Sequence, residues 1–274
     1  MNLSVTAYAV PPPLSRGGLG SPRKVNGFAR GSPTRGAGAQ RLRGCTKTGL
    51  PIIERRNPMS RCVIISACPV SASLASALRP GDTIIACDAG YRNCAPLHCR
   101  PDIIVGDFDT APCPAQEGDD TIILPHVKDD TDTEYAAKLA SEKGFDEALL
   151  LGVLGGRRLE HTLANLCTGL GLEQRGVRAT LLDERSRITF VMPGETRRYP
   201  KDGYFYLSVF PMEGRAEGVS ERGSFYELTD AVLTAGYPLG VSNEYADGSD
   251  CITISTQKGA LVVVETVPDG PILS

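Results

Sequence analysis

The stretch Ile103-Ile104-Val105-Gly106-Asp107-Phe108-Asp109-Thr110 joins an apolar run to two carboxylates one residue apart. Such a run, stopping at a glycine, is typical of a buried strand. Because side chains alternate along a strand, Asp107 and Asp109 are expected to point the same way where the strand ends. Two carboxylates this close repel each other unless a cation lies between them, and their oxygens suit Mg²⁺. The stretch indicates a metal–phosphate site, although an acidic turn explains it equally well.

A second acidic segment, Lys128-Asp129-Asp130-Thr131-Asp132, precedes a helix predicted over residues 133–144 from apolar residues at helical spacing. Asp129 or Asp132 is expected to cap this helix. One cap requires one acid, so metal or substrate binding is the better explanation for the others. The unpaired N–H groups at a helix N-terminus also favour phosphate.

A third segment, Gly155-Gly156-Arg157, lies between an apolar run at 148–154 and a helix predicted over 162–173. Paired glycines let the backbone approach a ligand, and arginine suits phosphate. The glycine spacing fits neither a Walker loop nor a dinucleotide fingerprint, and a plain turn explains the segment as well. His161, taken alone, is more typical of a helix start or a packing position.

Residues 82–90 form a fourth segment, in which an apolar run ends at Asp88. Strands and helices alternate over residues 61–184, which predicts an α/β domain with a Rossmann-like parallel sheet. Ligands bind beyond the carboxyl ends of the strands in such sheets, so these acidic and glycine-rich segments are expected to converge there. The predicted strands lie near Cys62, Thr83, Ile103, Thr121, Ala148 and Ala179.

Beyond residue 186 the pattern changes to short strands punctuated by Gly, Pro and Asn, which predicts an all-β sandwich domain. Gln257-Lys258-Gly259 is expected to turn the chain between the last two runs and make them a hairpin. The predicted runs are 187–192, 204–210, 231–234, 251–255 and 260–267. The predicted organisation is a tail (1–60), an α/β domain (61–185) and a β-sandwich domain (186–274).

The first sixty residues hold ten of the 29 basic residues and one of the 32 acidic residues, with abundant Gly, Pro and Ser. Such a segment buries too little apolar surface to fold, so disorder is expected. It resembles an Arg-rich transit leader or a weak RNA-binding arm. Because no amphipathic arginine face is evident, we favour upstream sequence translated from a start codon chosen too early.

The remaining residues carry a net charge near −12, which argues against a nucleic-acid partner. No apolar segment approaches the length of a membrane span. The nine cysteines show neither paired zinc-site spacing nor a compact disulfide framework, so reduced thiols in a cytoplasmic protein are expected.

Five motifs together resemble the thiamine pyrophosphokinase (thiamine diphosphokinase) family, over roughly residues 62–274. They are CDAGYRN (87–93), PDIIVGDFDT (101–110), KDDTDTE (128–134), GGRRLEH (155–161) with Asn165, and GVSNEY (240–245). The resemblance implies an α/β domain that holds ATP and Mg²⁺, and a β-sandwich that contributes to the thiamine pocket across a homodimer. The implied reaction transfers diphosphate from ATP to the hydroxyl of thiamine and releases AMP.

The resemblance also implies roles for individual residues. Asp88, Asp107, Asp109 and Asp132 correspond to the acidic cluster around Mg²⁺ and the phosphates, and Asp107, Asp109 and Asp132 are the candidate catalytic residues. Asp132 would contact the thiamine hydroxyl as base or orienting acceptor. The expected nucleotide-binding residues are Asp88, Asn93, Asp129, Arg157, His161 and Asn165. Tyr226, Ser242 and Asn243 would bind thiamine, with Tyr226 supplying the stacking aromatic because the chain has no Trp.

The chain departs from the family pattern mainly at Glu160, where the family has Asp, which puts a catalytic duty for this carboxylate in doubt. Thr110 replaces the usual Ser, and Ala89-Gly90 replaces a glycine pair. Two other functions fit the same residues: an Mg²⁺-dependent phosphohydrolase that uses water as nucleophile, and a non-catalytic sensor of thiamine or nucleotide.

Overall fold

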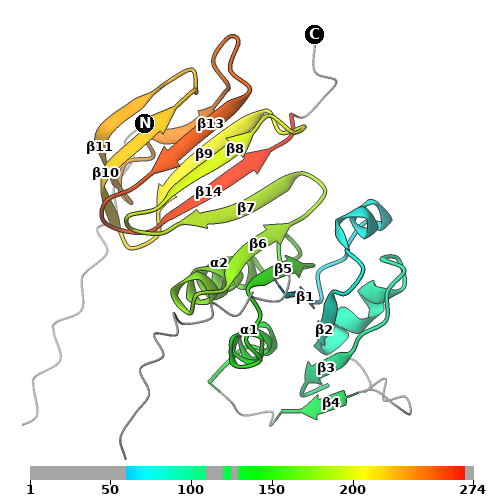
Figure 1. Ribbon diagram of the computed structural model, residues 1–274. Coiled ribbons are helices and arrows are strands. Elements are labelled where there is room, and N and C mark those ends of the chain that lie inside the picture. The colour runs from blue at the N-terminus through cyan, green and yellow to red at the C-terminus, as the bar shows by residue number, and fades with distance from the viewer. Residues whose placement is uncertain (1–59, 109–119, 125–128, 269–274) are drawn as a thin grey trace, which may run out of the picture. The chain divides into compact units, whose positions relative to one another are not determined.

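The computed structural model describes residues 60–108, 120–124 and 129–268. Asp109, Thr110 and the predicted tail, except for residue 60, lie outside the described residues. Within the described part, the strands form one sheet of ten and a second sheet of four (Figure 1). The mixed α/β architecture with a β-sandwich region confirms the predicted fold class.

Six strands of the large sheet are parallel, in the order β4-β3-β2-β1-β5-β6. Each matches a predicted strand, because each carries a short apolar run that a sheet covered on both faces requires. Their bounds are β1 (Arg61–Ile65), β2 (Thr83–Cys87), β3 (Ile103–Gly106), β4 (Asp120–Ile123), β5 (Glu147–Leu151) and β6 (Arg178–Leu182).

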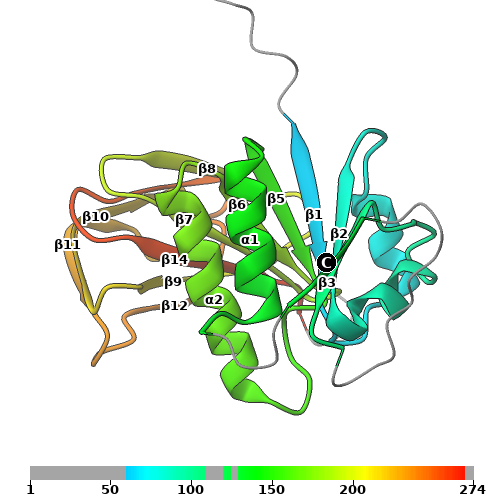
Figure 2. The ribbon, with the colours of Figure 1, turned by 90° about the horizontal axis from the view of Figure 1, so that it is seen from below.

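Helices α1 (Asp132–Glu142) and α2 (Leu159–Gln174) cover one face of these strands, as Figure 2 shows. The short 3₁₀ helices η1 (Ala72–Ala77) and η2 (Asp88–Cys94) pack on the opposite face. Side chains of β1 alternate between the two cores. No helix of the described part has the length and apolar character needed to cross a membrane.

The N-terminus of α1 differs from the prediction in a way that matters for the site. Thr131 caps the helix, because its Oγ1 accepts a hydrogen bond of 3.1 Å from the Glu134 backbone N–H. The prediction that Asp129 or Asp132 caps it was therefore wrong. Asp132 is the first helical residue, so its carboxylate is not committed to the cap. Helix α2 begins at Leu159, three residues before the predicted start.

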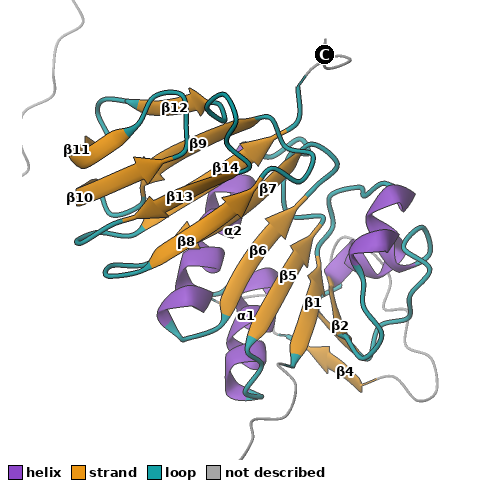
Figure 3. Ribbon diagram, turned by 45° about the horizontal axis from the view of Figure 1, so that its top comes forward, coloured by secondary structure: helices purple, strands orange, loops and turns teal. Residues whose placement is uncertain are grey.

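The large sheet continues beyond β6 through antiparallel strands, and a second antiparallel sheet packs against this half of it (Figure 3). The added strands are β7 (Ser186–Val191), β14 (Leu261–Thr266), β9 (Tyr206–Pro211) and β12 (Gly240–Asn243). The second sheet contains β11 (Leu228–Thr234), β10 (Arg215–Arg222), β13 (Cys251–Ser255) and β8 (Thr196–Pro200). The sheet thus runs without interruption across the domain boundary predicted at 185.

The predicted hairpin at 257–259 was wrong, because β13 and β14 belong to different sheets. β13 pairs with β10 and β8, whereas β14 pairs with β7 and β9. The turn carries the chain from one layer of the sandwich to the other. Gly259 makes this close passage possible: its φ is 76°, and an added Cβ would lie 2.3 Å from the carbonyl oxygen of Arg215.

Candidate functional site

Two of the predicted carboxylates follow the ends of neighbouring parallel strands. Asp88 follows β2, Asp107 follows β3, and the two strands pair side by side. Gly106 brings their backbones together, since a Cβ there would lie 3.0 Å from the Cα of Asp88. A side chain at this position would force the strand ends apart. The glycine that ends the apolar run therefore has a structural reason to precede the acidic residue.

A cavity of about 130 Å³ opens beyond the carboxyl ends of the strands, between the first turns of α1 and α2. It brings together residues from three of the sequence motifs. Asp88 comes from the first, Asp132 from the acidic segment before α1, and His161 and Asn165 from α2. The predicted convergence at this edge of the sheet is what the topology produces for these four residues.

Asp88 combines an unusual backbone conformation with a buried oxygen that lacks a hydrogen bond. Its backbone has a φ of 45°, in the left-handed region that residues other than glycine rarely adopt. Its Oδ1 atom is buried and accepts no hydrogen bond within the described residues. Phe108, beside Asp107, also has a positive φ, of 54°. Backbone strain and an unsatisfied buried oxygen both carry a free-energy cost, and such features cluster at functional sites.

The cavity floor is uncharged. Burial, followed by the charges of Asp132 and Asp88, raises the pKa of the Cys87 thiol well above its ordinary value. The thiol is therefore protonated near neutral pH and is no nucleophile there. Next to it, the Ser66 and Thr133 hydroxyl groups share a hydrogen bond of 2.6 Å. Asp88 and Asp132 thus share the cavity with uncharged hydroxyl and thiol groups.

The two asparagines predicted to bind the nucleotide, Asn93 and Asn165, form hydrogen bonds to backbone carbonyl groups instead. The Asn93 side-chain amide donates to the carbonyl oxygens of Ser66 and Cys68, at 2.7 and 2.8 Å. Asn165 donates to the carbonyl oxygen of Val153 at 2.7 Å. Both side chains are buried, and Asn93 has no further N–H to offer a nucleotide. They shape the loops that follow β1 and β5, and direct contact with ATP stays a prediction.

The remaining predicted residues of this region lie at its surface. Arg157 and Asp129 are exposed, and Asp107 is half-buried. Glu160, the residue that departs from the family pattern, pairs with Arg158 at 2.7 Å in solvent, and this arginine lowers the pKa of its carboxyl group. An exposed pair of this kind contributes little free energy. Glu160 does not line the cavity, so its extra methylene does not disturb it.

Two of the three residues predicted to bind thiamine, Tyr226 and Asn243, line a cavity of about 200 Å³ on the sandwich, whereas Ser242 does not line it. Tyr226 lines it and is 69 % exposed, with its ring packed edge-on against Phe225 at 4.8 Å. Asn243 is buried and forms two hydrogen bonds with the Tyr226 backbone. Its Oδ1 accepts from the Tyr226 N–H at 3.0 Å, and its Nδ2 donates to the Tyr226 carbonyl oxygen at 2.8 Å. Ser242 is exposed, with a φ of 54°.

Glu221, on β10, lines the same cavity and was missed by the sequence analysis. It is 1 % exposed, and its Oε1 accepts a hydrogen bond of 2.7 Å from Nδ2 of Asn243. Its Oε2 accepts none within the described residues. Burial raises the pKa of its carboxyl group to about 7. The two-residue spacing from Val219, which is buried in the sandwich core, is the signal that could have placed it facing inward.

Two family models match the chain on either side of β7. The model described as "Thiamin pyrophosphokinase, catalytic domain" matches residues 74–181, and "Thiamin pyrophosphokinase, vitamin B1 binding domain" matches residues 197–261. The chain belongs to the thiamine pyrophosphokinase family. The first match contains Asp88, Asp132, His161 and Asn165 of the cavity at the strand ends, here called the acidic cavity, whereas Ser66, Ala67 and Cys68 of its lining precede the match. The second match contains the whole cavity lined by Glu221 and Tyr226, here called the Tyr226 cavity.

Individual proteins of this family are similar to the chain over part of their length. A thiamine pyrophosphokinase of Bacillus subtilis is 28 % identical over 139 residues, which are 51 % of this chain and 64 % of that protein. The chain thus spans somewhat less than two thirds of this curated relative.

Solved structures of the family share the fold. The thiamin pyrophosphokinase of Geobacillus thermodenitrificans has a TM-score of 0.68 at 25 % identity, covering 77 % of this chain and 99 % of that one. The yeast enzyme has a TM-score of 0.63 at 12 % identity, covering 78 % and 88 %. This second likeness concerns the fold alone.

The two family regions place their cavities at different parts of the large sheet. Asn243 lies on β12, the first strand in the sheet order, whereas the acidic cavity lies beyond the ends of β5, β1 and β2, the sixth to eighth strands. Five to seven inter-strand steps separate them, which at ~4.8 Å a step is ~24–34 Å measured along the sheet. A single chain therefore holds the acidic cavity and the Tyr226 cavity far apart.

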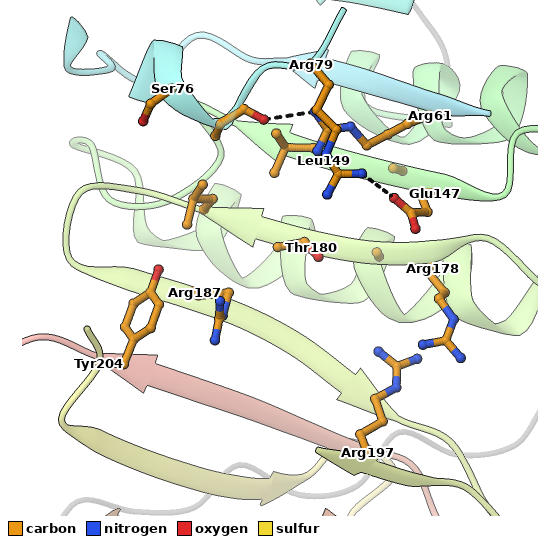
Figure 4. Close-up of a pocket in the computed structure, with 14 residues that line it drawn as sticks. Arg61, Ser76, Arg79, Glu147, Leu149, Arg178, Thr180, Arg187, Arg197 and Tyr204 are labelled. Carbon is orange, nitrogen blue, oxygen red and sulfur yellow. Dashed lines mark hydrogen bonds and ion pairs between the residues drawn. The ribbon is translucent and has the colours of Figure 1, made fainter. Parts of the chain in front are cut away.

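A larger cavity, of about 500 Å³, lies elsewhere on the same sheet (Figure 4). It lies over the face of β5 and β6 opposite α1 and α2, and Ser76 and Ala77 of η1 and Arg197 of β8 also line it. Most of the arginines along it are already neutralised by carboxylates: Arg61 by Asp82, Arg79 by Glu147, Arg187 by Glu265 and Arg197 by Glu173. It shares no residue with the acidic cavity.

Proposed function

We propose that this thiamine pyrophosphokinase family member transfers the terminal diphosphate of ATP to the hydroxyl group of thiamine in an Mg²⁺-dependent reaction. The hydroxyl oxygen of thiamine forms a bond to the β-phosphorus, and the bond from that phosphorus to the oxygen bridging the α- and β-phosphates breaks. AMP leaves with the bridging oxygen, and the hydroxyl proton passes to a base. The substrate supplies the nucleophile, so the protein positions groups and balances charge.

The observation that carries the proposal is the cavity where Asp88 and Asp132 meet the first turns of α1 and α2. N–H groups at helix N-termini favour phosphate oxygens. Arg157, exposed in the loop before α2, adds a guanidinium that suits a phosphate group. His161 and Asn165 line the same cavity on the α2 side, where they can orient the nucleotide.

The donor set fits Mg²⁺. The buried Oδ1 of Asp88 accepts no hydrogen bond within the described residues, which is the state of an oxygen reserved for a cation. The described residues hold no group of three or more metal-ligating side chains. Mg²⁺ usually takes one or two carboxylates, and Asp88, Asp107 and Asp132, with Asp109 outside the described residues, are the candidates. When bound, the ion neutralises phosphate charge.

Thiamine binding is assigned to the Tyr226 cavity. An exposed aromatic ring beside apolar side chains offers a flat surface for an electron-poor heteroaromatic ring. Asn243 uses its amide group on the Tyr226 backbone and on Glu221, so we propose that it positions Tyr226. Ser242 is exposed between Val241 and Asn243, which line the cavity, and we keep it as a contact to thiamine.

We further propose that two chains complete each active site. The hydroxyl of thiamine must come within about 3–3.5 Å of the phosphorus to react. The ~24–34 Å that separates the two cavities along the sheet is far beyond this distance within one chain. In a symmetric dimer, the Tyr226 cavity of one chain can face the acidic cavity of the other.

The direct test is AMP formation from ATP and Mg²⁺, with and without thiamine. We expect AMP only when thiamine is present, in equal amount to thiamine diphosphate, and no AMP after removal of Mg²⁺ by a chelator. Phosphate release that is indifferent to thiamine would replace the proposal with a phosphohydrolase. Thiamine or nucleotide binding without any product would replace it with a sensor.

A further inference from the structure

We propose that Glu221 recognises the aminopyrimidine ring of thiamine, using the carboxyl oxygen that Asn243 leaves unused. This inference rests on the proposed function and identifies the side chain that recognises thiamine within the Tyr226 cavity. Glu221 contacts the ring only and takes no part in the transfer of diphosphate, which occurs at the other end of the substrate.

The cavity has the size and lining for a single ring. Its volume, about 200 Å³, is below the ~300 Å³ at which pockets for whole drug-sized ligands begin. Apolar side chains, Leu228, Leu239 and Val241, form its walls. Tyr226 stands at the opening with its ring exposed. A planar ring entering here stacks on Tyr226 and presents its edge to the polar group inside.

Glu221 is that polar group, and one of its oxygens is available. Oε1 accepts the hydrogen bond from Asn243, whereas Oε2 is buried without a partner in the described residues. Leaving a buried polar atom unsatisfied costs free energy, so a ligand that satisfies it gains affinity. Asn243 also fixes Tyr226, so one amide aligns the carboxyl group and the aromatic ring.

The aminopyrimidine ring of thiamine matches a protonated carboxyl group. Its exocyclic amine donates a hydrogen bond, and the adjacent ring nitrogen accepts one. A carboxylic acid offers the complementary pair: a protonated Oε2 donates to the ring nitrogen, and Oε1, which keeps a second lone pair beside the one used by Asn243, accepts from the amine. A carboxylate offers acceptors only, so it loses the hydrogen bond to the ring nitrogen. Recognition of this edge therefore requires the acid form of Glu221.

The surroundings favour the acid form. Burial raises the pKa of Glu221, and the nearby Glu227 carboxylate adds to the effect, while the Ser224 hydroxyl and the Asn243 amide oppose it, for a value of about 7. Glu227 is itself exposed and pairs with Arg222 at 3.0 Å. The ladder neighbours of Glu221 are apolar, Leu228 on β11 and Ile254 on β13, and the Tyr226 phenol is the other titratable group lining the cavity.

The test compares thiamine binding by calorimetry at pH 6 and pH 8 for the full chain and two variants. For the unmodified chain, Kd should rise about tenfold between these values, because they lie one unit on either side of a pKa of about 7. Glu221→Gln keeps a donor and an acceptor at every pH, so its Kd should not change with pH. Glu221→Leu should bind about tenfold more weakly at pH 6.

A second ligand and a matched control exclude a purely structural role. A thiamine analogue with a carbonyl in place of the amine should bind the unmodified chain more weakly than thiamine, and Glu221→Leu should discriminate less between the two. Glu217→Gln changes an exposed carboxylate on the same strand and should keep the unmodified pH profile. Thermal melting checks that each variant is folded.

Two results overturn the inference and can be told apart. If thiamine binds and Glu221→Gln keeps the pH dependence of the unmodified chain, or Glu221→Leu binds as well as that chain, the assignment to Glu221 is wrong while the proposed function stands. If the unmodified chain binds no thiamine at either pH, the proposed function fails and this inference with it.

Discussion

The acidic cavity and the Tyr226 cavity are built in opposite ways. The acidic cavity collects residues from strand ends and helix starts, with Asp88 held in a left-handed conformation beside the neighbouring strand. The Tyr226 cavity is built from one hydrogen-bond network, in which Asn243 ties Glu221 to the Tyr226 backbone. The first places charges where parallel strands end. The second depends on strands that are distant in sequence packing face to face.

This difference indicates what each cavity contributes. Fixed carboxylates, helix N-termini and an exposed arginine suit the charge of phosphates and a cation. A narrow apolar cavity with one buried carboxyl group suits an uncharged ring edge. The chain thus separates charge neutralisation from recognition, and the next four experiments act on one cavity while leaving the other intact.

The largest effect is expected from the acidic cavity. Asp107→Asn removes one of the charges assigned to Mg²⁺ and the phosphates, so kcat should fall by roughly 10²–10³ while thiamine binding is retained. Asp130→Asn is the matched control, because Asp130 pairs with Lys138 near the start of the same site and should leave kcat nearly unchanged. A folded Asp107→Asn protein with full activity would contradict the assignment of Asp107 as a ligand of Mg²⁺.

In the Tyr226 cavity, titration of Glu221 is expected to make the unfolding free energy of the protein depend on pH. The pKa of Glu221 rises from 4.5 to about 7 on folding, so its contribution to stability is complete below pH 4.5 and is lost as the pH rises through 7. Over this range, the unmodified chain should lose about 3 kcal/mol of unfolding free energy relative to Glu221→Gln. Urea unfolding at pH 5, 6, 7 and 8 measures this, and parallel stabilities for the two proteins would show that Glu221 is charged throughout.

Removing the exposed ring should affect substrate affinity. Tyr226→Ala should raise the KM for thiamine about tenfold, because stacking on an aromatic or cation–aromatic surface contributes up to about 1.4 kcal/mol. The KM for ATP should not change, since the acidic cavity is untouched. Tyr226→Phe keeps the ring and should stay within about twofold of the unmodified chain. Equal losses for both substitutions would mean that the hydroxyl group, and not the ring, makes the contact.

The smallest effect is expected at Glu160. Its carboxylate pairs with Arg158 in solvent and lies outside the cavity, so Glu160→Gln should change kcat and both KM values by less than about twofold. Steady-state kinetics at two salt concentrations would check this. A loss comparable to that of Asp107→Asn would place Glu160 in the catalytic machinery after all.

The sequence predicted the acidic cavity better than the Tyr226 cavity for a physical reason. Buried parallel strands are continuous apolar runs, so the ends of β2 and β3, and the carboxylates after them, can be seen in one dimension. β10 was missed because only Ala216 and Val219 mark its apolar inner face, and its register shifts on both sides of Val219 break the period of two. Glu221 keeps the two-residue spacing from Val219, but a charged residue is rarely buried, so its inward position was overlooked.

Side-chain partners and layer changes were also beyond sequence reasoning. Thr131, and not an aspartate, caps α1. The sequence could not identify the cap, because each residue from Asp129 to Asp132 is of a type that can serve as one. The turn at 257–259 resembles a hairpin turn, and only the packing shows that it changes sheets. Asn93 was grouped with the nucleotide by its motif, whereas its hydrogen bonds to Ser66 and Cys68 depend on the fold.

The most direct test mixes two impaired variants, Asp107→Asn and Tyr226→Ala, after dissociation and reassociation of their subunits. The assay uses thiamine well below its KM, where Tyr226→Ala alone should keep only about a tenth of the activity. If each active site combines the acidic cavity of one chain with the Tyr226 cavity of the other, half of the dimers are mixed and each carries one intact site. Thiamine-dependent AMP formation should then recover to about a quarter of that of the unmodified protein. Activity no greater than the mean of the two separate variants would contradict the shared site.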